Sequence, residues 1–135
     1  MHATCVAVGD NAVLLMGASG TGKSTIALEL MAYGATLVSD DQVMLLAEND
    51  VIVASAPPTI TGLIEARGFG VLKAQAQDSA SIVMVVNLDV PAVDRMPARR
   101  VVTLLGCDLP LFQRPDGGNL APAILQFLRA GISDR

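Results

Sequence analysis

The feature that most constrains this chain is a glycine-rich loop between an apolar stretch and a helical pattern. Residues 17–24 read GASGTGKS, which fits the G-x-x-x-x-G-K-[ST] pattern of a phosphate-binding loop. The preceding "AVLLM" (12–16) predicts a strand, and the apolar spacing that follows predicts a helix over 22–33. A strand–loop–helix unit of this kind presents backbone N–H groups and the positive end of a helix dipole to an anion.

The residue types in the loop suit a nucleotide together with a metal ion. Glycines let several N–H groups turn toward one centre. Lys23 adds a mobile positive charge for the terminal phosphates, and Ser24 offers a hydroxyl oxygen to Mg²⁺. We therefore predict that the chain binds ATP and Mg²⁺. The residues predicted to contact the nucleotide are Gly17, Ala18, Ser19, Gly20, Thr21, Gly22, Lys23, Ser24 and Thr25.

A phosphate-binding loop also needs an acidic residue for the metal, commonly at the end of an apolar strand. Asp40 and Asp41 follow "ATLVS" (35–39), and Asp89 follows "IVMVVNL" (82–88). Asp89 reads most simply as a turn residue at a strand end. Two adjacent carboxylates repel each other unless a cation lies between them. This favours the Asp40–Asp41 pair, with one carboxylate holding Mg²⁺ and the other accepting a proton.

Composition excludes several classes of protein. The chain has 135 residues, 52% hydrophobic and 16% charged, which predicts one folded domain. No apolar run approaches the ~20 residues of a membrane-spanning helix, and no secretory signal is recognisable, so we expect a cytoplasmic protein. A net charge of −4, scattered cations and 3% aromatic residues argue against nucleic acid as a partner. Cys5 and Cys107 lack metal-type spacing and are expected to be reduced thiols.

The rest of the chain predicts a mixed α/β sheet with flanking helices. Pro57-Pro58 is expected to begin an extended segment, residues 91–118 to be rich in loops, and Asn119 to cap a final helix that ends near residue 130. The apolar stripe of that helix is expected to be Leu120, Ala123, Ile124, Phe127 and Leu128. The further predicted strands are 3–8, 35–39, the hairpin 42–46 and 51–54, and 81–90.

Three segments in order resemble the catalytic domain of the HPr kinase/phosphorylases, bacterial serine kinases that act on the phosphocarrier HPr. They are "GASGTGKST" (17–25), "LVSDD" (37–41) and "IEARGFG" (64–70), the last being the most specific. His2 also matches a family histidine, and "RPDGGNLAPAILQFLRA" (114–130) is similar to a late family segment. The resemblance covers residues 2–130. It implies one catalytic domain over 1–135, with a phosphate-binding-loop fold similar to that of phosphoenolpyruvate carboxykinase.

The resemblance also implies roles for individual residues. Asp40 would accept the proton of the substrate serine, and His2 would orient that carboxylate. Asp41 and Glu65 would lie near the metal with Ser24. Arg95 would be the catalytic arginine. Two nearby residues, Arg99 and Arg100, compete for that last role, and Glu65 could instead form a simple ion pair with Arg67.

The family runs the reaction in both directions, since inorganic phosphate can attack the phosphoserine. It also forms hexamers, so we expect a homo-oligomer with an HPr-like protein as its partner. The chain departs from the family pattern by leaving no room for the N-terminal domain of longer members. It also has Asp116-Gly117 where the family tends to have Gly-Arg. Two other functions stay open: a small-molecule kinase with 91–118 as a lid, and a nucleotide-binding regulatory module without catalysis.

Overall fold

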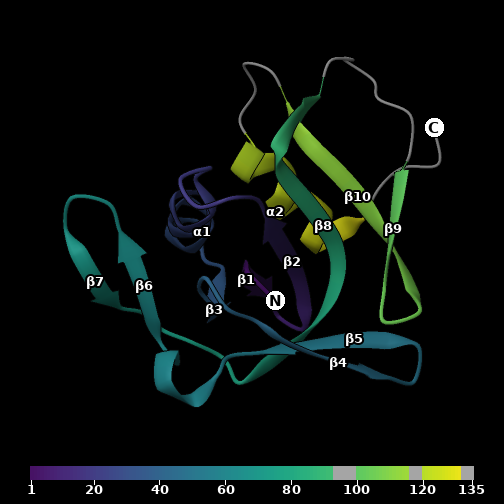
Figure 1. Cartoon of the computed structure of the whole chain (residues 1–135), viewed down its shortest axis with the longest axis horizontal. Helices are drawn as coiled ribbons and strands as arrows, with labels where there is room; N and C mark the ends of the chain where they lie inside the picture. The colour runs from purple at the N-terminus through teal and green to yellow at the C-terminus, as the bar shows by residue number, and fades with distance from the viewer. Residues whose placement is uncertain (93–99, 116–119, 132–135) are drawn as a thin grey trace.

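A computed structural model of the chain describes residues 1–92, 100–115 and 120–131, and its main feature is an eight-stranded mixed sheet (Figure 1). The main path through the sheet runs β3 (Thr36–Ser39), β1 (Ala3–Val8), β2 (Asn11–Met16), β8 (Ser79–Ala92), β10 (Cys107–Pro115) and β9 (Arg100–Leu104). Strands β2, β8 and β10 run parallel, whereas β1 pairs antiparallel with both of its neighbours. The predicted mixed α/β sheet is confirmed.

Strand β8 is the branch point of the sheet. Its start pairs antiparallel with β5 (Val51–Ser55), which forms a hairpin with β4 (Met44–Glu48), and its later part pairs with β10. Asn49 and Asp50 turn that hairpin with φ values of 50° and 65°. Positive φ at both central residues is what a two-residue hairpin turn with the twist of its strands requires. The hairpin predicted around these residues is therefore confirmed.

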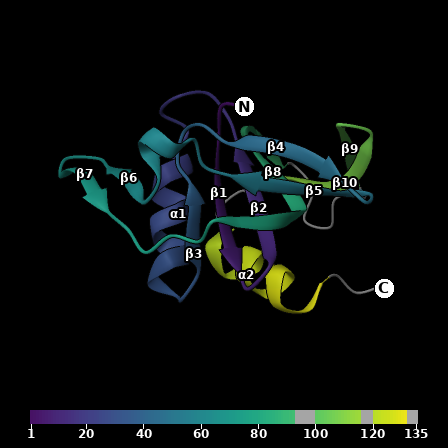
Figure 2. The same ribbon diagram turned by 90° about the horizontal axis from the view of Figure 1, so that it is seen from below.

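Two helices cover one face of the sheet. Helix α1 (Lys23–Ala32) and helix α2 (Leu120–Ala130) both contact the β1–β2 hairpin (Figure 2). Successive side chains of β1 alternate between two cores, as strand geometry requires. Val6 packs with Leu30 of α1 and Ile124 of α2, whereas Cys5 packs on the opposite face with Ile52. No helix in these described ranges is long and apolar enough to cross a membrane.

Helix α1 begins and ends close to the predicted positions. Gly22 caps its start with a φ of 100°, and Gly34 follows its end with a φ of 105°. The predicted stripe of α2 is wrong in part. Ile124 and Leu128 are buried as expected, but Ala123 is exposed and Leu125 is buried in its place.

A two-stranded hairpin projects away from the main sheet on the side opposite β9 and β10 (Figures 1 and 2). Its strands are β6 (Leu63–Ala66) and β7 (Gly70–Lys73), and only β6 packs closely on α1. A short 3₁₀ helix, η1 (Pro58–Ile60), precedes it. The extended segment predicted after Pro57-Pro58 is therefore wrong, because Pro58 starts a helical turn, a position that suits its fixed φ.

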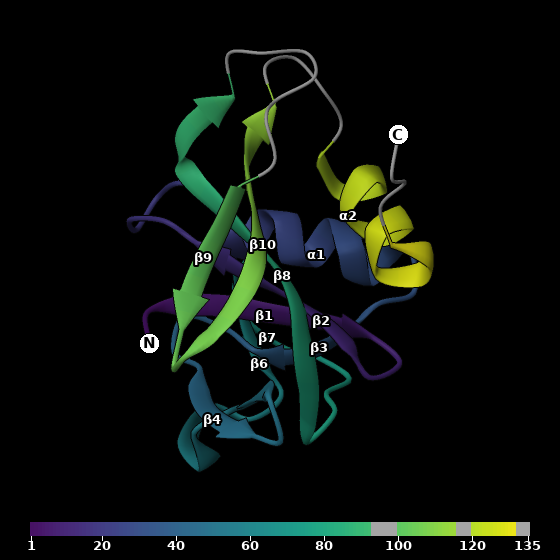
Figure 3. The same ribbon diagram turned by 90° about the vertical axis from the view of Figure 1, so that its right-hand side faces the viewer.

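The prediction that residues 91–118 are rich in loops is wrong for the described part of this segment. Strands β9 and β10 occupy much of it (Figure 3). Pro110 weakens the local strand signal, because proline cannot donate a hydrogen bond to a neighbouring strand. In the structure it faces Val101 of β9, while the pairing of β10 with β8 starts one residue later, at Leu111. The proline thus lies where β10 is paired on one side only.

The buried thiol of Cys5 yields a prediction about reactivity. Burial raises the pKa of Cys5 from 9.0 to about 12, because the thiolate would lose its hydration. Cys107 is only half-buried. We expect a disulfide reagent to modify Cys107 in the native protein, and both cysteines only after denaturation.

The same shift predicts the sign of a pH effect on stability. As the pH rises, the Cys5 thiol loses its proton in the unfolded chain before it does so in the folded protein. Its contribution to the free energy of unfolding is therefore fully present below pH 9.0 and is lost as the pH rises toward about 12. Between pH 8 and pH 10, the free energy of unfolding measured with urea should fall more for the wild type than for Cys5→Ala. Rapid modification of both thiols in the native state would contradict the buried placement of Cys5.

Candidate active site

The glycine loop joins β2 to α1 in a conformation that glycine alone tolerates. Gly17, Gly20 and Gly22 have φ values of 151°, 89° and 100°. A Cβ atom on Gly17 would lie 2.6 Å from Thr21 Oγ1. That hydroxyl donates a hydrogen bond to the Ala18 carbonyl (2.7 Å), which closes the loop on itself. The loop therefore has a fixed shape that a larger residue at position 17 would disturb.

Lys23 opens helix α1 and folds back over the loop. Its side chain is buried, and its Nζ atom donates to the carbonyl oxygens of Gly17 (2.7 Å) and Ala18 (3.1 Å). A buried ammonium needs such partners. The positive charge is thus held beside the N–H groups at the start of the helix, where an anion is favoured.

Asp40 is a buried carboxylate that accepts hydrogen bonds from three separate elements. Its Oδ1 atom accepts from the hydroxyls of Thr4 on β1 (2.9 Å) and Ser24 on α1 (2.7 Å). Its Oδ2 atom accepts from the backbone N–H of Glu65 on β6 (3.0 Å). Only 7% of Asp40 is exposed, so these donors replace the water that an ionised carboxylate would otherwise bind.

Asp41 follows directly but its side chain lies elsewhere. The Gln42 N–H donates to the Asp40 carbonyl (2.9 Å), and Asp41 between them has a φ of 70°. A three-residue turn with positive φ at its centre is rare and strained for a residue with a side chain. The turn leaves the Asp41 side chain 64% exposed while Asp40 points into the protein. It thereby separates the two adjacent carboxylates.

His2 contacts Asp41 rather than Asp40. Its Nε2 atom lies 3.0 Å from Asp41 Oδ1, and its backbone forms a bridge with Gln42. The expectation that His2 orients the Asp40 carboxylate is therefore wrong: β1 carries Thr4, not His2, up to Asp40.

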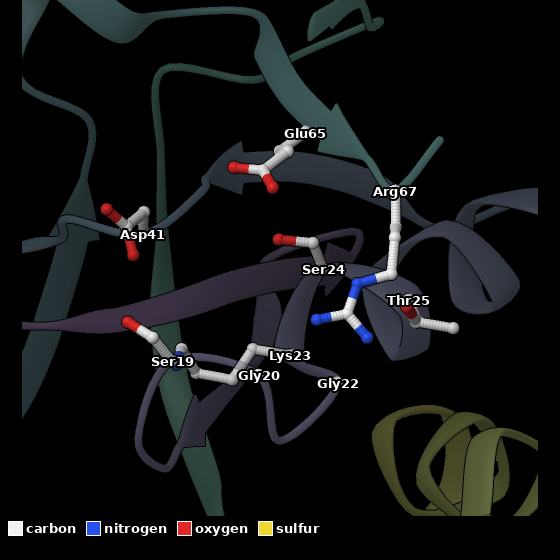
Figure 4. A pocket seen from close by; sticks show the side chains of 9 residues that line it. All are labelled: Ser19, Gly20, Gly22, Lys23, Ser24, Thr25, Asp41, Glu65 and Arg67. Carbon is white, nitrogen blue, oxygen red and sulfur yellow. The ribbon is translucent and has the colours of Figure 1, made fainter. Parts of the chain in front are cut away.

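A cavity of about 130 Å³ opens beside the loop. Figure 4 shows the carboxylates of Asp41 and Glu65 and the hydroxyl of Ser24 around one space, with the Arg67 guanidinium across from them. Six of the nine predicted nucleotide contacts line it: Ser19, Gly20, Gly22, Lys23, Ser24 and Thr25. Gly17, Ala18 and Thr21 do not line the cavity but shape the loop.

The donors around this cavity fit Mg²⁺ bound to a nucleotide better than a bare metal ion. Within residues 1–92, 100–115 and 120–131, no three His, Cys, Asp or Glu side chains gather as a metal-binding group. Mg²⁺ commonly takes one or two carboxylates and fills its remaining positions with phosphate oxygens and water. The two carboxylates and one hydroxyl of the cavity suit that mode. The metal-binding roles of Ser24, Asp41 and Glu65 stay predictions.

Several residues at the site escaped the sequence-based assignment of roles. Thr4 was visible only as the one hydroxyl in an apolar strand. Arg67 lines the cavity, and among the described residues it forms no ion pair with Glu65. Asp89 and Arg114 contact the loop from two other strands. Arg95, the predicted catalytic arginine, and its competitor Arg99 lie outside the described residues.

Comparisons with known proteins agree with this geometry. The family described as "HPr Serine kinase C-terminal domain" matches residues 1–104. The HPr kinase/phosphorylase of Bacillus cytotoxicus is 38% identical over 98 residues, which is 67% of this chain and 32% of that protein. HPr kinase/phosphorylase 1 of Oceanobacillus iheyensis is 37% identical over 97 residues, 66% of this chain and 31% of that protein. The chain thus spans about a third of the length of these relatives.

A solved structure shares the fold. The Hpr(Ser) kinase/phosphatase from Coxiella burnetii superimposes with a TM-score of 0.80 at 24% sequence identity. The match covers 96% of this chain and 93% of that one. The two chains therefore share the same overall fold.

Thr4 provides a test of the buried Asp40 site. Thr4→Val keeps the shape of the side chain but removes a hydroxyl that donates to a buried carboxylate. We expect it to lower the free energy of unfolding by about 1–3 kcal/mol, measured by urea denaturation. Thr4→Ser keeps the hydroxyl donor and should lower the free energy of unfolding by less than Thr4→Val does. If Thr4→Val were as stable as the wild type, the hydrogen bond from Thr4 to Asp40 would contribute nothing to the stability of the fold.

Proposed function

Since the chain belongs to the HPr serine kinase C-terminal domain family, we propose that residues 1–135 form one catalytic domain that phosphorylates a protein serine with ATP. The substrate is an HPr-like phosphocarrier of a bacterial phosphotransferase system, and the reaction regulates carbon metabolism. The observation that carries the proposal is the contact between Asp40 Oδ1 and the Ser24 hydroxyl (2.7 Å). It joins a candidate proton acceptor to the phosphate-binding loop.

The loop and Lys23 bind the phosphates of ATP in this mechanism. Lys23 rests on two loop carbonyls, from which its ammonium can move to a phosphate oxygen without leaving the loop. Mg²⁺, when bound, offsets negative charge on the transferring phosphoryl group. Ser24, Asp41 and Glu65 are the residues that would hold it, directly or through water.

Asp40 accepts the proton of the substrate serine. A serine hydroxyl is a poor nucleophile at neutral pH and needs a base within hydrogen-bond reach. Asp40 Oδ1 already accepts from a hydroxyl, that of Ser24. When the Ser24 hydroxyl turns away, Oδ1 keeps the Thr4 hydroxyl as a donor and can accept a hydrogen bond from the substrate in place of Ser24. In the reverse direction the protonated Asp40 donates to the departing serine oxygen while inorganic phosphate takes the phosphoryl group.

Two arginines have roles in this proposal. Arg67 lines the cavity and lies beside the loop, since a Cβ atom on Gly20 would be 3.9 Å from its Nη2 atom. Its charge offsets that of the phosphates. Arg95 is proposed as the second arginine on the resemblance alone. His2, paired with Asp41, is proposed to hold that carboxylate in place beside the cavity.

We also propose that the protein acts in the cytoplasm as a homo-oligomer, with a hexamer expected from the resemblance. Exposed apolar side chains support an oligomer, among them Phe69 (86% exposed) and Val71 (67%) on the β6–β7 hairpin. Exposure of several large apolar side chains on one hairpin favours an interface there. Light scattering at micromolar concentration tests this, and a monomer would contradict it.

The proposed function is tested by incubating the protein with ATP, Mg²⁺ and an HPr-type phosphocarrier and measuring phosphoserine on the carrier by mass spectrometry. Asp40→Asn should lower the transfer rate by about 10²–10⁴-fold, the usual contribution of a general base, with ATP affinity within about tenfold of the wild type. Lys23→Ala should weaken both transfer and ATP binding.

The matched control is Asp108→Asn, since Asp108 is exposed on β10 and bonds only to Thr103 among the described residues. It should behave as the wild type. Full transfer by Asp40→Asn would contradict the assignment of the base. Tight ATP binding without any transfer by the wild type would favour the regulatory module or a different substrate.

A further inference from the structure

We propose that Asp89 and Arg114 are positioning residues that fix two peptide units of the phosphate-binding loop from outside the phosphate cavity. Asp89 lies on β8 and Arg114 on β10, and neither lines the cavity. Each contacts the backbone of the loop with a charged side chain. The inference rests on the proposed function only in requiring that the loop binds phosphate.

Asp89 holds the first peptide unit of the loop. Its Oδ1 atom accepts a hydrogen bond from the Ala18 N–H (3.0 Å). In a trans peptide the N–H and C=O groups point in opposite directions, so the Gly17 carbonyl of the same unit points away from Asp89. That carbonyl accepts from Lys23 Nζ at 2.7 Å. One peptide unit thus connects Asp89 to the position of the Lys23 ammonium.

Arg114 holds the last peptide unit of the loop by its carbonyl group, whereas Asp89 holds the first unit by its N–H group. Its Nη2 atom donates to the Thr21 carbonyl. The N–H of the same unit belongs to Gly22 and must point away from Arg114. Gly22 lines the cavity and Arg114 does not. Arg114 therefore turns the Gly22 N–H toward the side on which a phosphate would bind.

The pairing of β8 with β10 is irregular at Asp89 and Arg114. The pairing of β10 with β8 passes from Gln113↔Asn87 directly to Arg114↔Pro91, so residues 88–90 of β8 have no partner on β10. Asp89 is the middle residue of this bulge, and its N–H donates to the Asn87 side chain (2.9 Å) instead. Bulges re-aim side chains next to functional sites. This one frees Asp89 to reach the loop.

The environment of Arg114 also points to a function beyond folding. Its Nε atom is buried and has no hydrogen-bond partner among the described residues. An unsatisfied buried donor is costly, and a native protein rarely keeps one without a reason. A carbonyl bond from a charged donor is stronger than one from a neutral donor. The guanidinium thus makes a charged hydrogen bond to the loop at the cost of one unsatisfied donor.

The test compares the binding of Mg²⁺–ATP with that of Mg²⁺–pyrophosphate by calorimetry. Pyrophosphate lacks the nucleoside, so its affinity reports only on the contacts to the phosphates and the metal, those of the loop among them. Arg114→Met keeps the length of the side chain and should weaken both ligands by the same factor, about 10- to 100-fold, as expected for loss of one charged hydrogen bond. Arg114→Lys keeps a donor and should recover part of the affinity. Arg129→Met, on the exposed side of α2, is the matched control and should change neither affinity.

Asp89 is tested with a pair of substitutions. Asp89→Asn keeps the oxygen that accepts from Ala18 N–H, so affinity for pyrophosphate should stay within about threefold of the wild type. Asp89→Ala should weaken the binding of pyrophosphate by about the same factor as Arg114→Met. Asp108→Ala is the control on the same sheet. Thermal unfolding of every variant identifies any loss of affinity that follows from misfolding.

Three results would overturn the inference. Loss of ATP affinity with unchanged pyrophosphate affinity in Arg114→Met would mean that Arg114 contacts the nucleoside. Equal losses in Asp89→Asn and Asp89→Ala would mean that the negative charge acts, as a metal ligand would. Unchanged affinity in both Arg114→Met and Asp89→Ala would mean that neither holds the loop. If the wild type binds both ligands but transfers no phosphate to HPr, only the proposed function fails.

Discussion

The buried carboxylate of Asp40 connects three elements of the chain: β1, α1 and the projecting β6–β7 hairpin. The projecting β6–β7 hairpin pairs with no strand of the main sheet, yet the Glu65 N–H on β6 bonds to Asp40 Oδ2 (3.0 Å). Thr4 and Ser24 bind the other oxygen from β1 and α1. Burying an ionised carboxylate is unfavourable unless such donors are present. The position of the hairpin, and with it of Glu65 and Arg67, therefore depends on this group together with the packing of β6 on α1.

The glycine loop is held both by its own side chains and by side chains from two strands of the main sheet. The Lys23 ammonium donates to the Gly17 carbonyl, and the Thr21 hydroxyl donates to the Ala18 carbonyl. Asp89 and Arg114 contact it from β8 and β10. Donors that are already oriented cost little reorganisation when charge develops on a phosphoryl group. Strain at Asp41, with a φ of 70°, keeps the second carboxylate at the cavity while the first stays buried.

The parts of this architecture that depend on local sequence were predictable. The glycine loop, helix α1, the early strands and the strongly apolar β8 follow from periodicity and glycine placement. Strands β9 and β10 were missed because Pro110 weakens the local strand signal, which long-range pairing with β8 overrides. The partner of His2 was predicted wrongly because a strained turn at Asp41 cannot be read from the sequence. Asp89 and Arg114 reach the loop through a bulge in strand pairing that no spacing rule reveals.

The most direct test of the central place of Asp40 is amide hydrogen exchange at Glu65, followed by NMR in the nucleotide-free protein. The Phe69 amide, which bonds within the turn of the same hairpin, provides the reference. If Asp40 anchors the hairpin, the Glu65 amide should exchange at least tenfold more slowly than that of Phe69, after correction for intrinsic rates, because its opening requires breaking a buried charged bond. Equal exchange at the two amides would show that the hairpin moves independently of Asp40 and would contradict the account.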